Sequence, residues 1–235
     1  MMIEKNCVLL FVKYPAPGQV KVRLKSETIP YNVVDLYRHF VLDLLSMLQR
    51  SRLCFYVVYH PSDALDQFRT WLPNKLQYLP QQGKDLGERL DYAFQTAFSR
   101  GHQRVIALGS DIPDLSSAIL NRAFEALRTD DAVIGSSPDG GYYLIGFQAM
   151  SFSSTIFTDI PWSSNTVFSQ TCAKLRKIGR NVHFLPPWSD VDTVIDLQTL
   201  LRRNLPTSFR CSHTMTYLRP YQAALLAYQS REKRP

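Results

Sequence analysis

The chain of 235 residues has few cysteines, and no two of them form a CxxC pair. Its five histidines are equally dispersed. This spacing gives no support for a disulfide framework, for a zinc site of closely spaced ligands or for a His-rich metal site. We therefore expect reduced cysteines in a cytoplasmic protein. The cysteines are Cys7, Cys54, Cys172 and Cys211.

Long hydrophobic runs are also missing. No apolar stretch is long enough to span a bilayer. The N-terminus is not typical of a signal peptide, because Glu4 lies among the first residues and the apolar stretch of residues 8–12 is too short. We therefore expect a cytoplasmic location and no membrane-spanning segment.

Most of the chain has little net charge. Seven cationic side chains and one carboxylate, Glu232, lie from Leu200 onward, so this segment carries +6 of the total +7 and residues 1–199 carry +1. A nearly neutral body argues against a nucleic-acid partner. We expect the basic tail to be solvated surface rather than a contact for a membrane, an acidic partner or another subunit.

Short apolar runs alternate with segments of helical periodicity along the chain. This alternation predicts βαβ crossovers and an α/β fold with a mostly parallel sheet and helices on both faces. We expect one Rossmann-like domain over residues 1–205 and a basic appendage over residues 206–235 with one docked helix. The predicted strands are residues 7–12, 53–59, 76–79, 104–108, 132–135, 142–147 and 182–185.

Asp111 follows the apolar run of residues 105–108 and the pair Gly109-Ser110, and Pro113 prevents further strand pairing. In open α/β sheets, ligands bind beyond the carboxyl ends of the strands. A carboxylate there can hold a hard divalent cation, which in turn binds phosphates. Asp111 therefore predicts an enzyme that acts on a nucleotide or a nucleotide-sugar.

A second acidic segment follows the last predicted strand. Asp190 and Asp192 are two residues apart, so both can face one side of an extended stretch. Such a pair suits Mg²⁺, which takes few protein ligands and several waters. One carboxylate among these two and Asp196 is expected to cap the next helix.

The loop after the first predicted strand is cationic. Lys13, Lys21 and Arg23 can bind a diphosphate. Pro17 stiffens the loop, and Gly18 allows the backbone to approach a ligand. The residues alone are equally compatible with a solvated basic loop. Neither a GxGxxG nor a GxxxxGK[ST] motif is present.

Two further segments are candidates for ligand contact. Gln82, Gly83 and Asp85 precede a predicted helix and can bind an anion or a base edge, although the segment alone favours a helix cap made by Asp85. Gly140 and Gly141 can make room for a sugar while Asp139 accepts hydroxyl protons. Asp-Gly between two strands is also an ordinary turn signal.

These segments resemble a bacterial family of GT-A-like glycosyltransferases, or nucleotide-diphospho-sugar transferases. The similarity lies in residues 11–24, 82–89, 109–115, 139–146 and 190–197, and it extends to about Arg203. Two positions depart from the family pattern. Val22 replaces the usual Thr, which removes a hydroxyl from the phosphate loop, and Ile112 stands where Cys is frequent.

The resemblance implies a GT-A fold that binds a nucleoside diphosphate sugar with Mg²⁺ or Mn²⁺. More distantly, the chain is similar to phospholactate and molybdenum-cofactor guanylyltransferases. Carried over by motif, the metal ligands are Asp111 and Asp192, the phosphate-binding residues include Lys13, Lys21 and Arg23, and Gln82, Gly83 and Asp85 lie near the base.

Three functions remain open. In glycosyl transfer, Asp139 positions or deprotonates the acceptor hydroxyl. In nucleotidyl transfer, Lys21 and Arg23 neutralise the reacting phosphates of an NTP. A non-catalytic nucleotide-binding protein is the third. The expected partners are a nucleotide or nucleotide-sugar and an unidentified acceptor, and the sequence is compatible with a homo-oligomer.

Overall fold

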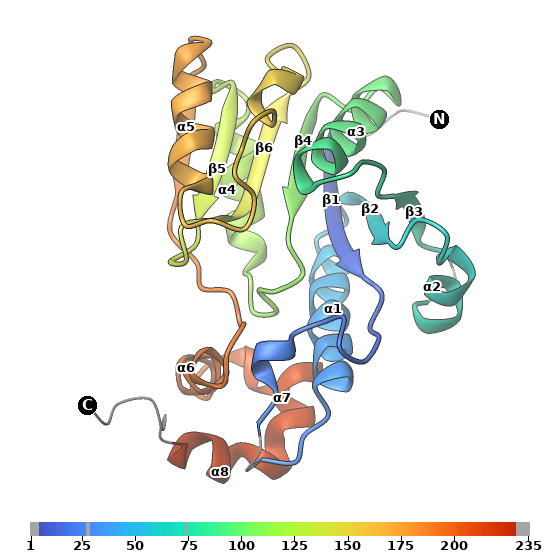
Figure 1. Cartoon of the computed structure of the whole chain (residues 1–235), viewed down its shortest axis with the longest axis vertical. Coiled ribbons are helices and arrows are strands. Elements are labelled where there is room, and N and C mark those ends of the chain that lie inside the picture. The colour runs from blue at the N-terminus through green and yellow to red at the C-terminus, as the bar shows by residue number, and fades with distance from the viewer. Residues whose placement is uncertain (1–4, 27–28, 74, 229–235) are drawn as a thin grey trace. The chain divides into compact units, whose positions relative to one another are not determined.

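The computed structural model describes residues 5–26, 29–73 and 75–228, whose strands form one mixed sheet (Figure 1). Its seven strands have the order β3-β2-β1-β4-β6-β5-β7. Only β6 is antiparallel to its neighbours β4 and β5. The strands are β1 (Asn6–Lys13), β2 (Cys54–His60), β3 (Gln77–Pro80), β4 (Arg104–Leu108), β5 (Ala132–Ser136), β6 (Tyr142–Gln148) and β7 (Val182–Leu185).

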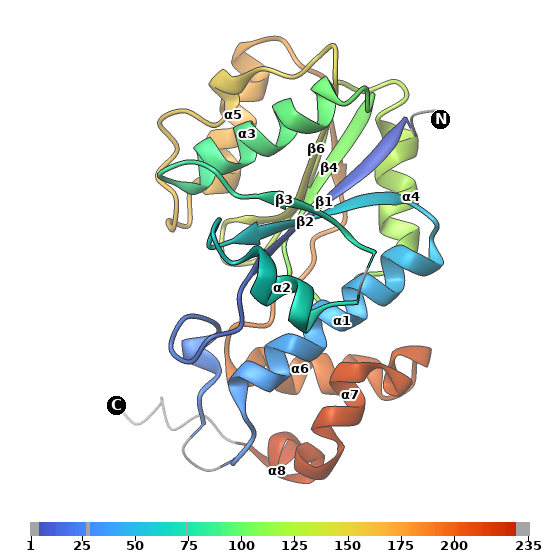
Figure 2. The same cartoon turned by 90° about the vertical axis from the view of Figure 1, so that its right-hand side faces the viewer.

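Helices cover both faces of this sheet, as the continuously apolar strands predict. Figure 2 shows α3 and α5 on one side and α4 on the other. On the first side, Phe94 of α3 stacks against Phe98 and packs edge-to-face against Phe147 of β6. The helices are α2 (Leu65–Trp71), α3 (Leu86–Ser99), α4 (Ser117–Ala126) and α5 (Val167–Lys177).

The described chain divides into two compact units. The sheet unit contains residues 1–14, 48–109 and 116–188, and the helical unit contains residues 15–47, 110–115 and 189–235. The helical unit is therefore assembled from three separate stretches of sequence. The domain boundary predicted at residue 205 stays a prediction.

The helical unit contains most of α1 (Val33–Arg50) together with helices from the end of the chain. Asn32 caps α1, because its side-chain oxygen accepts hydrogen bonds from the N–H groups of Val34 and Asp35. The other helices are η1 (Val22–Leu24), α6 (Val194–Asn204), η3 (Ser208–Cys211), α7 (His213–Leu218), η4 (Arg219–Tyr221) and α8 (Gln222–Ala227).

The residues after 205 pack against α6. The side-chain amide of Gln198 lies 3.0–3.1 Å from the carbonyl oxygens of Leu225, Leu226 and Tyr228. Leu225 is fully buried. Helix α8 therefore corresponds to the docked helix predicted for residues 206–235. The tail residues Arg231, Glu232, Lys233 and Arg234, and Glu4 at the other end, lie outside the described residues.

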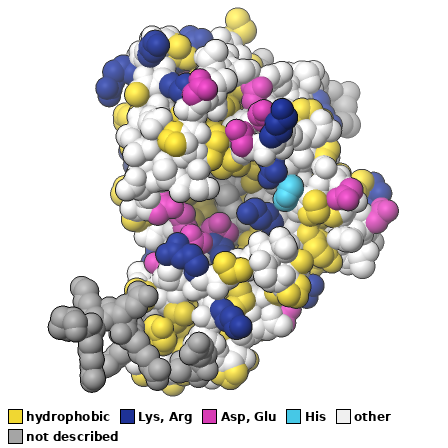
Figure 3. Space-filling view, in the orientation of Figure 1, with side chains coloured by type: hydrophobic (Ala, Val, Ile, Leu, Met, Phe, Trp, Pro, Cys, Tyr) yellow, Lys and Arg dark blue, Asp and Glu magenta, His cyan; other side chains and the backbone are white. Residues whose placement is uncertain are grey.

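No helix among the described residues is long and apolar enough to cross a membrane. On the face drawn in Figure 3, the cationic side chains of the described residues are interspersed with acidic ones.

Candidate metal- and phosphate-binding site

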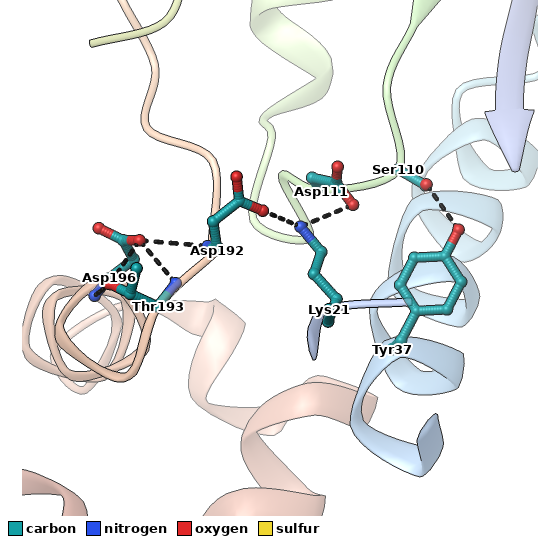
Figure 4. A network of polar contacts seen from close by, with 7 residues as sticks. All are labelled: Lys21, Tyr37, Ser110, Asp111, Asp192, Thr193 and Asp196. Atoms are coloured by element: carbon teal, nitrogen blue, oxygen red, sulfur yellow. Dashed lines mark hydrogen bonds and ion pairs between the residues drawn. The ribbon is translucent and has the colours of Figure 1, made fainter. Parts of the chain in front are cut away.

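Three of the predicted site residues meet in the helical unit (Figure 4). The Nζ atom of Lys21 lies 2.8 Å from Oδ1 of Asp111 and 2.5 Å from Oδ1 of Asp192. The Lys21 side chain is only 5% exposed, whereas those of Asp111 and Asp192 are 45% and 39% exposed. Two carboxylates from distant parts of the chain thus converge on one buried cation.

The segment that carries Asp111 is held by contacts on both sides. The hydroxyl groups of Ser110 and the buried Tyr37 of α1 lie 2.8 Å apart. The N–H of Val191 donates a 2.8 Å hydrogen bond to the carbonyl oxygen of Asp111. This backbone bond connects the two acidic segments directly.

Asp114 fixes the same segment to α6. Arg203 donates two hydrogen bonds to its carboxylate, of 2.6 and 2.7 Å, and Asn204 donates a third of 2.6 Å. The Asp114 side chain is 2% exposed. Asp114 does not cap the following helix, because the N-cap of α4 is Ser116.

Asp192 stands just before a capping box. The N-cap of α6 is Thr193, whose hydroxyl accepts a hydrogen bond from the N–H of Asp196. The Asp196 carboxylate in turn accepts from the N–H groups of Thr193 and Asp192. Asp196 is thus the carboxylate that belongs to the helix cap, while the Asp192 side chain turns toward Lys21.

The backbone of Lys21 is in the left-handed region, with φ 49° and ψ 38°, at the start of η1. Burial alone lowers the pKa of a lysine, but Asp111 and Asp192 outweigh it and raise the pKa of Lys21 above its ordinary value. Lys21 therefore keeps its charge at neutral pH.

The donor set fits a hard divalent cation. Asp111 and Asp192 offer carboxylate oxygens that already face one positive charge, and their exposure leaves room for water ligands. In the structure as described, the Lys21 ammonium neutralises half of this paired charge.

The remaining loop residues of the predicted site also lie in the helical unit. The N–H of Gln19 donates to the carbonyl oxygen of Ala16, so residues 16–19, including Pro17, form a turn. Gly18 has a φ of 72° in this turn, with open space around it. Arg23 in η1 is exposed. The loop therefore presents its backbone and one guanidinium to solvent.

Gln82, Gly83 and Asp85 belong to the sheet unit and form the entry to α3. Asp85 is the N-cap of this helix, accepting a 2.9 Å hydrogen bond from the N–H of Glu88. Gly83 has a φ of 132°, and a Cβ there would lie 2.5 Å from Glu88. Both residues thus have structural roles, and their contact with a base stays a prediction.

Asp139, Gly140 and Gly141 form the turn before β6 in the sheet unit. One carboxylate oxygen of Asp139 accepts hydrogen bonds from the N–H of Gly141 and the hydroxyl of Ser137. Gly140 has a φ of 89°, and a Cβ there would lie 2.0 Å from the carbonyl oxygen of Asn165. Lys13 is exposed at the end of β1 in the same unit.

Several residues that shape the site were not predicted. Tyr37 lies on the apolar stripe of its helix, and Arg203 and Asn204 lie at the end of theirs, so the pattern marks none of them as a site residue. Only the spatial approach of α1 and α6 to residues 110–115 within the helical unit gives them their roles.

The fold defined by this sheet order is the nucleotidyltransferase and GT-A-like α/β fold, which solved structures confirm. One of these solved structures is a crystal structure described as a "putative nucleotide-diphospho-sugar transferase" from Desulfovibrio desulfuricans G20. It is 43% identical, has a TM-score of 0.91, and the match covers 96% of this chain and 99% of that chain.

The chain belongs to the family described as "Uncharacterized protein conserved in bacteria (DUF2064)", whose model matches residues 43–164. Together with the 43% identical structure, this confirms the predicted family resemblance. The search of curated proteins found no match.

Two more distant structures share the fold. CMP:2-keto-3-deoxy-manno-octonic acid synthetase complexed with CTP is 11% identical with a TM-score of 0.52, and the match covers 86% of this chain and all of that chain. A cytidylyltransferase from Leptospira borgpetersenii serovar Hardjo-bovis (strain JB197) is 13% identical with a TM-score of 0.56, covering 98% of this chain and all of that chain.

Proposed function

We propose that this protein is a divalent-cation-dependent transferase that uses a nucleoside diphosphate sugar as glycosyl donor. The observation that carries the proposal is the convergence of Asp111 and Asp192 on the ammonium of Lys21. The name of the 43% identical relative supports the donor class. We further propose a cytoplasmic location.

Each residue of the cluster has a distinct chemical role. Asp111 and Asp192 hold Mg²⁺ or Mn²⁺, which supplies a Lewis acid for the diphosphate leaving group. Lys21 and the exposed Arg23 bind phosphate oxygens and neutralise the charge that develops on them. Such preorganised charges stabilise the transition state more than the ground state.

Asp139 is the residue that we propose to act on the acceptor hydroxyl. Its Oδ1 atom is engaged by Ser137 and Gly141, which fixes the orientation of the carboxylate. Its second oxygen can then accept the proton of an acceptor hydroxyl as a general base. The other residues that we propose to contact the donor are Lys13, Gln82, Gly83, Asp85, Gly140 and Gly141 of the sheet unit and Pro17 and Gly18 of the helical unit.

Nucleotidyl transfer from an NTP to a phosphorylated acceptor is the second candidate. The fold shared with the synthetase complexed with CTP and with the cytidylyltransferase favours it. The same charged residues serve this reaction, because it also requires a neutralised, correctly oriented phosphate chain.

The products separate the two reactions. Release of UDP or GDP from a nucleotide-sugar, with Mn²⁺ present, supports glycosyl transfer. Release of pyrophosphate from an NTP in a panel of phosphorylated acceptors supports nucleotidyl transfer instead. Thermal-shift screening of both ligand classes, with and without Mn²⁺, selects the donors to test, because a ligand of the native state raises the melting temperature. Metal-independent nucleotide binding with neither product would indicate a non-catalytic binding protein.

A further inference from the structure

Three potential metal ligands that are dispersed in the sequence meet in the sheet unit. Cys7, Cys54 and His102 each offer one ligand atom, and these atoms all lie within 4.8 Å of one another. Cys7 and His102 are buried, whereas Cys54 is half-buried. All three belong to residues 1–14 and 48–109 of the sheet unit, whereas Asp111 and Asp192 belong to the helical unit.

The strand register explains how the cluster forms. Cys7 of β1 is the direct partner of Cys54 at the start of β2, so in a parallel pair their side chains project from the same face. On the other side of β1, Asn6 pairs with Arg104 at the start of β4, and His102 lies two residues before it. The amino-terminal ends of three adjacent strands thus bring the three side chains together.

Neighbouring contacts orient these side chains. The Nε2 atom of His102 lies 3.3 Å from the hydroxyl of Tyr56, and the Arg100 guanidinium lies 4.8 Å from the centre of the Tyr56 ring. The thiol of Cys7 makes a long contact of 3.8 Å with the carbonyl oxygen of Val8. The contact with Tyr56 therefore holds the histidine ring in place.

We propose that Cys7, Cys54 and His102 bind Zn²⁺ in a site that connects the beginnings of β1, β2 and β4. On binding, each of the two thiols releases its proton to solvent and forms a Zn–S bond, while His102 binds the metal through a ring nitrogen. The two thiolates balance the metal charge, so the buried complex is neutral. A water molecule on the more exposed Cys54 side completes the tetrahedral coordination.

The chemistry of the ligands selects this metal. Two thiolates and one imidazole match the soft-to-borderline preference of Zn²⁺ and disfavour Mg²⁺ or Ca²⁺, which prefer oxygen. Bond lengths of about 2.3 Å for Zn–S and about 2.0 Å for Zn–N place ligand atoms about 3.5–3.8 Å apart in a tetrahedral site. The ligand atoms lie within 4.8 Å of one another, so small side-chain movements bring them to this spacing.

The test is a titration of the full-length, fully reduced protein with Co²⁺, which substitutes for Zn²⁺ and gives a thiolate charge-transfer band in the near ultraviolet. We expect saturation at one Co²⁺ per chain, loss of the band on adding Zn²⁺, and release of about two protons per metal at neutral pH because free thiols are mostly protonated there. We also expect Zn²⁺ to raise the melting temperature.

Variants locate the site. Cys54→Ser changes a half-buried residue and should abolish the band and the Zn²⁺-dependent thermal shift, and His102→Ala should weaken both. Cys172→Ser is the matched control, since Cys172 is a half-buried cysteine of α5 that packs against the same core. No thiolate band in wild-type protein, or a band that survives Cys54→Ser or disappears in Cys172→Ser, would overturn the proposal.

Discussion

The backbone N–H of Val191 lies 2.8 Å from the carbonyl oxygen of Asp111 and donates a hydrogen bond to it. This bond sets the separation of the two acidic segments without using either carboxylate. The side chains of Asp111 and Asp192 therefore stay available for a cation, and Lys21 fills that position in the structure (Figure 4).

Replacing Lys21 by Met tests the balance of charge in this cluster. Because the ammonium no longer neutralises the carboxylates, Mn²⁺ alone should bind about tenfold more tightly, a difference of about 1.4 kcal/mol. Binding of nucleoside diphosphates should weaken, because a phosphate ligand is lost. Isothermal calorimetry measures both affinities.

Lys25→Met is the matched control, since Lys25 is an exposed cation at the end of the same η1 segment. It should leave both affinities within about twofold of wild type, because exposed charges are strongly screened. Equal Mn²⁺ affinity of wild type and Lys21→Met would show that the ammonium does not compete for the carboxylates.

Arg203→Met should destabilise the protein by about 3–5 kcal/mol, because it leaves the buried Asp114 carboxylate without its cation. Arg202→Met, on the same helix, removes only one long hydrogen bond of 3.4 Å and should cost less than about 1 kcal/mol. Urea denaturation measures both changes. Similar effects of the two substitutions would contradict the structural role of the Asp114 contacts.

Tyr31 makes stability sensitive to alkaline pH. Burial, with smaller contributions from Tyr228 and Tyr217, raises its pKa to about 12. Since the folded pKa lies above the unfolded value of about 10, the stabilisation is complete below pH 10 and is lost as pH rises toward 12.

Tyr31→Phe should therefore show a shallower loss of unfolding free energy above pH 10. At pH 8 it should be less stable by about 1 kcal/mol, because the hydrogen bond to the carbonyl oxygen of Leu24 is lost. Urea denaturation at several pH values compares the slopes. Parallel pH profiles for the two proteins would show that Tyr31 does not cause the alkaline sensitivity.

Much of the fold could be predicted from hydrophobic periodicity alone. The predicted strand at 104–108 agrees with β4, and the strand at 182–185 agrees with β7. The order of the strands could not be predicted, because periodicity does not specify pairing partners. Nothing local to residues 142–148 indicates that β6 inserts between β4 and β5 in antiparallel orientation.

The site was predicted in part. Lys21, Asp111 and Asp192 could be selected because each follows an apolar strand in a loop or at a helix start. The partners of Asp114 could not, since its salt bridge to Arg203 joins residues far apart in sequence. The same holds for Cys7 and its neighbours, whose approach depends on strand pairing rather than on spacing along the chain.

The direct test of the central claim is calorimetry of UDP and GDP binding to wild type and Asp111→Asn, with and without Mn²⁺. Asp35→Asn is the control, because Asp35 is similarly exposed in the same unit and forms a local salt bridge with Arg38. We predict that Mn²⁺ strengthens nucleotide binding to wild type and to Asp35→Asn. The Asp111→Asn variant should keep its fold, but in the presence of Mn²⁺ it should bind nucleotide at least about tenfold more weakly than wild type, a difference of about 1.4 kcal/mol. Equal Mn²⁺-dependent binding by Asp111→Asn and wild type would contradict the account.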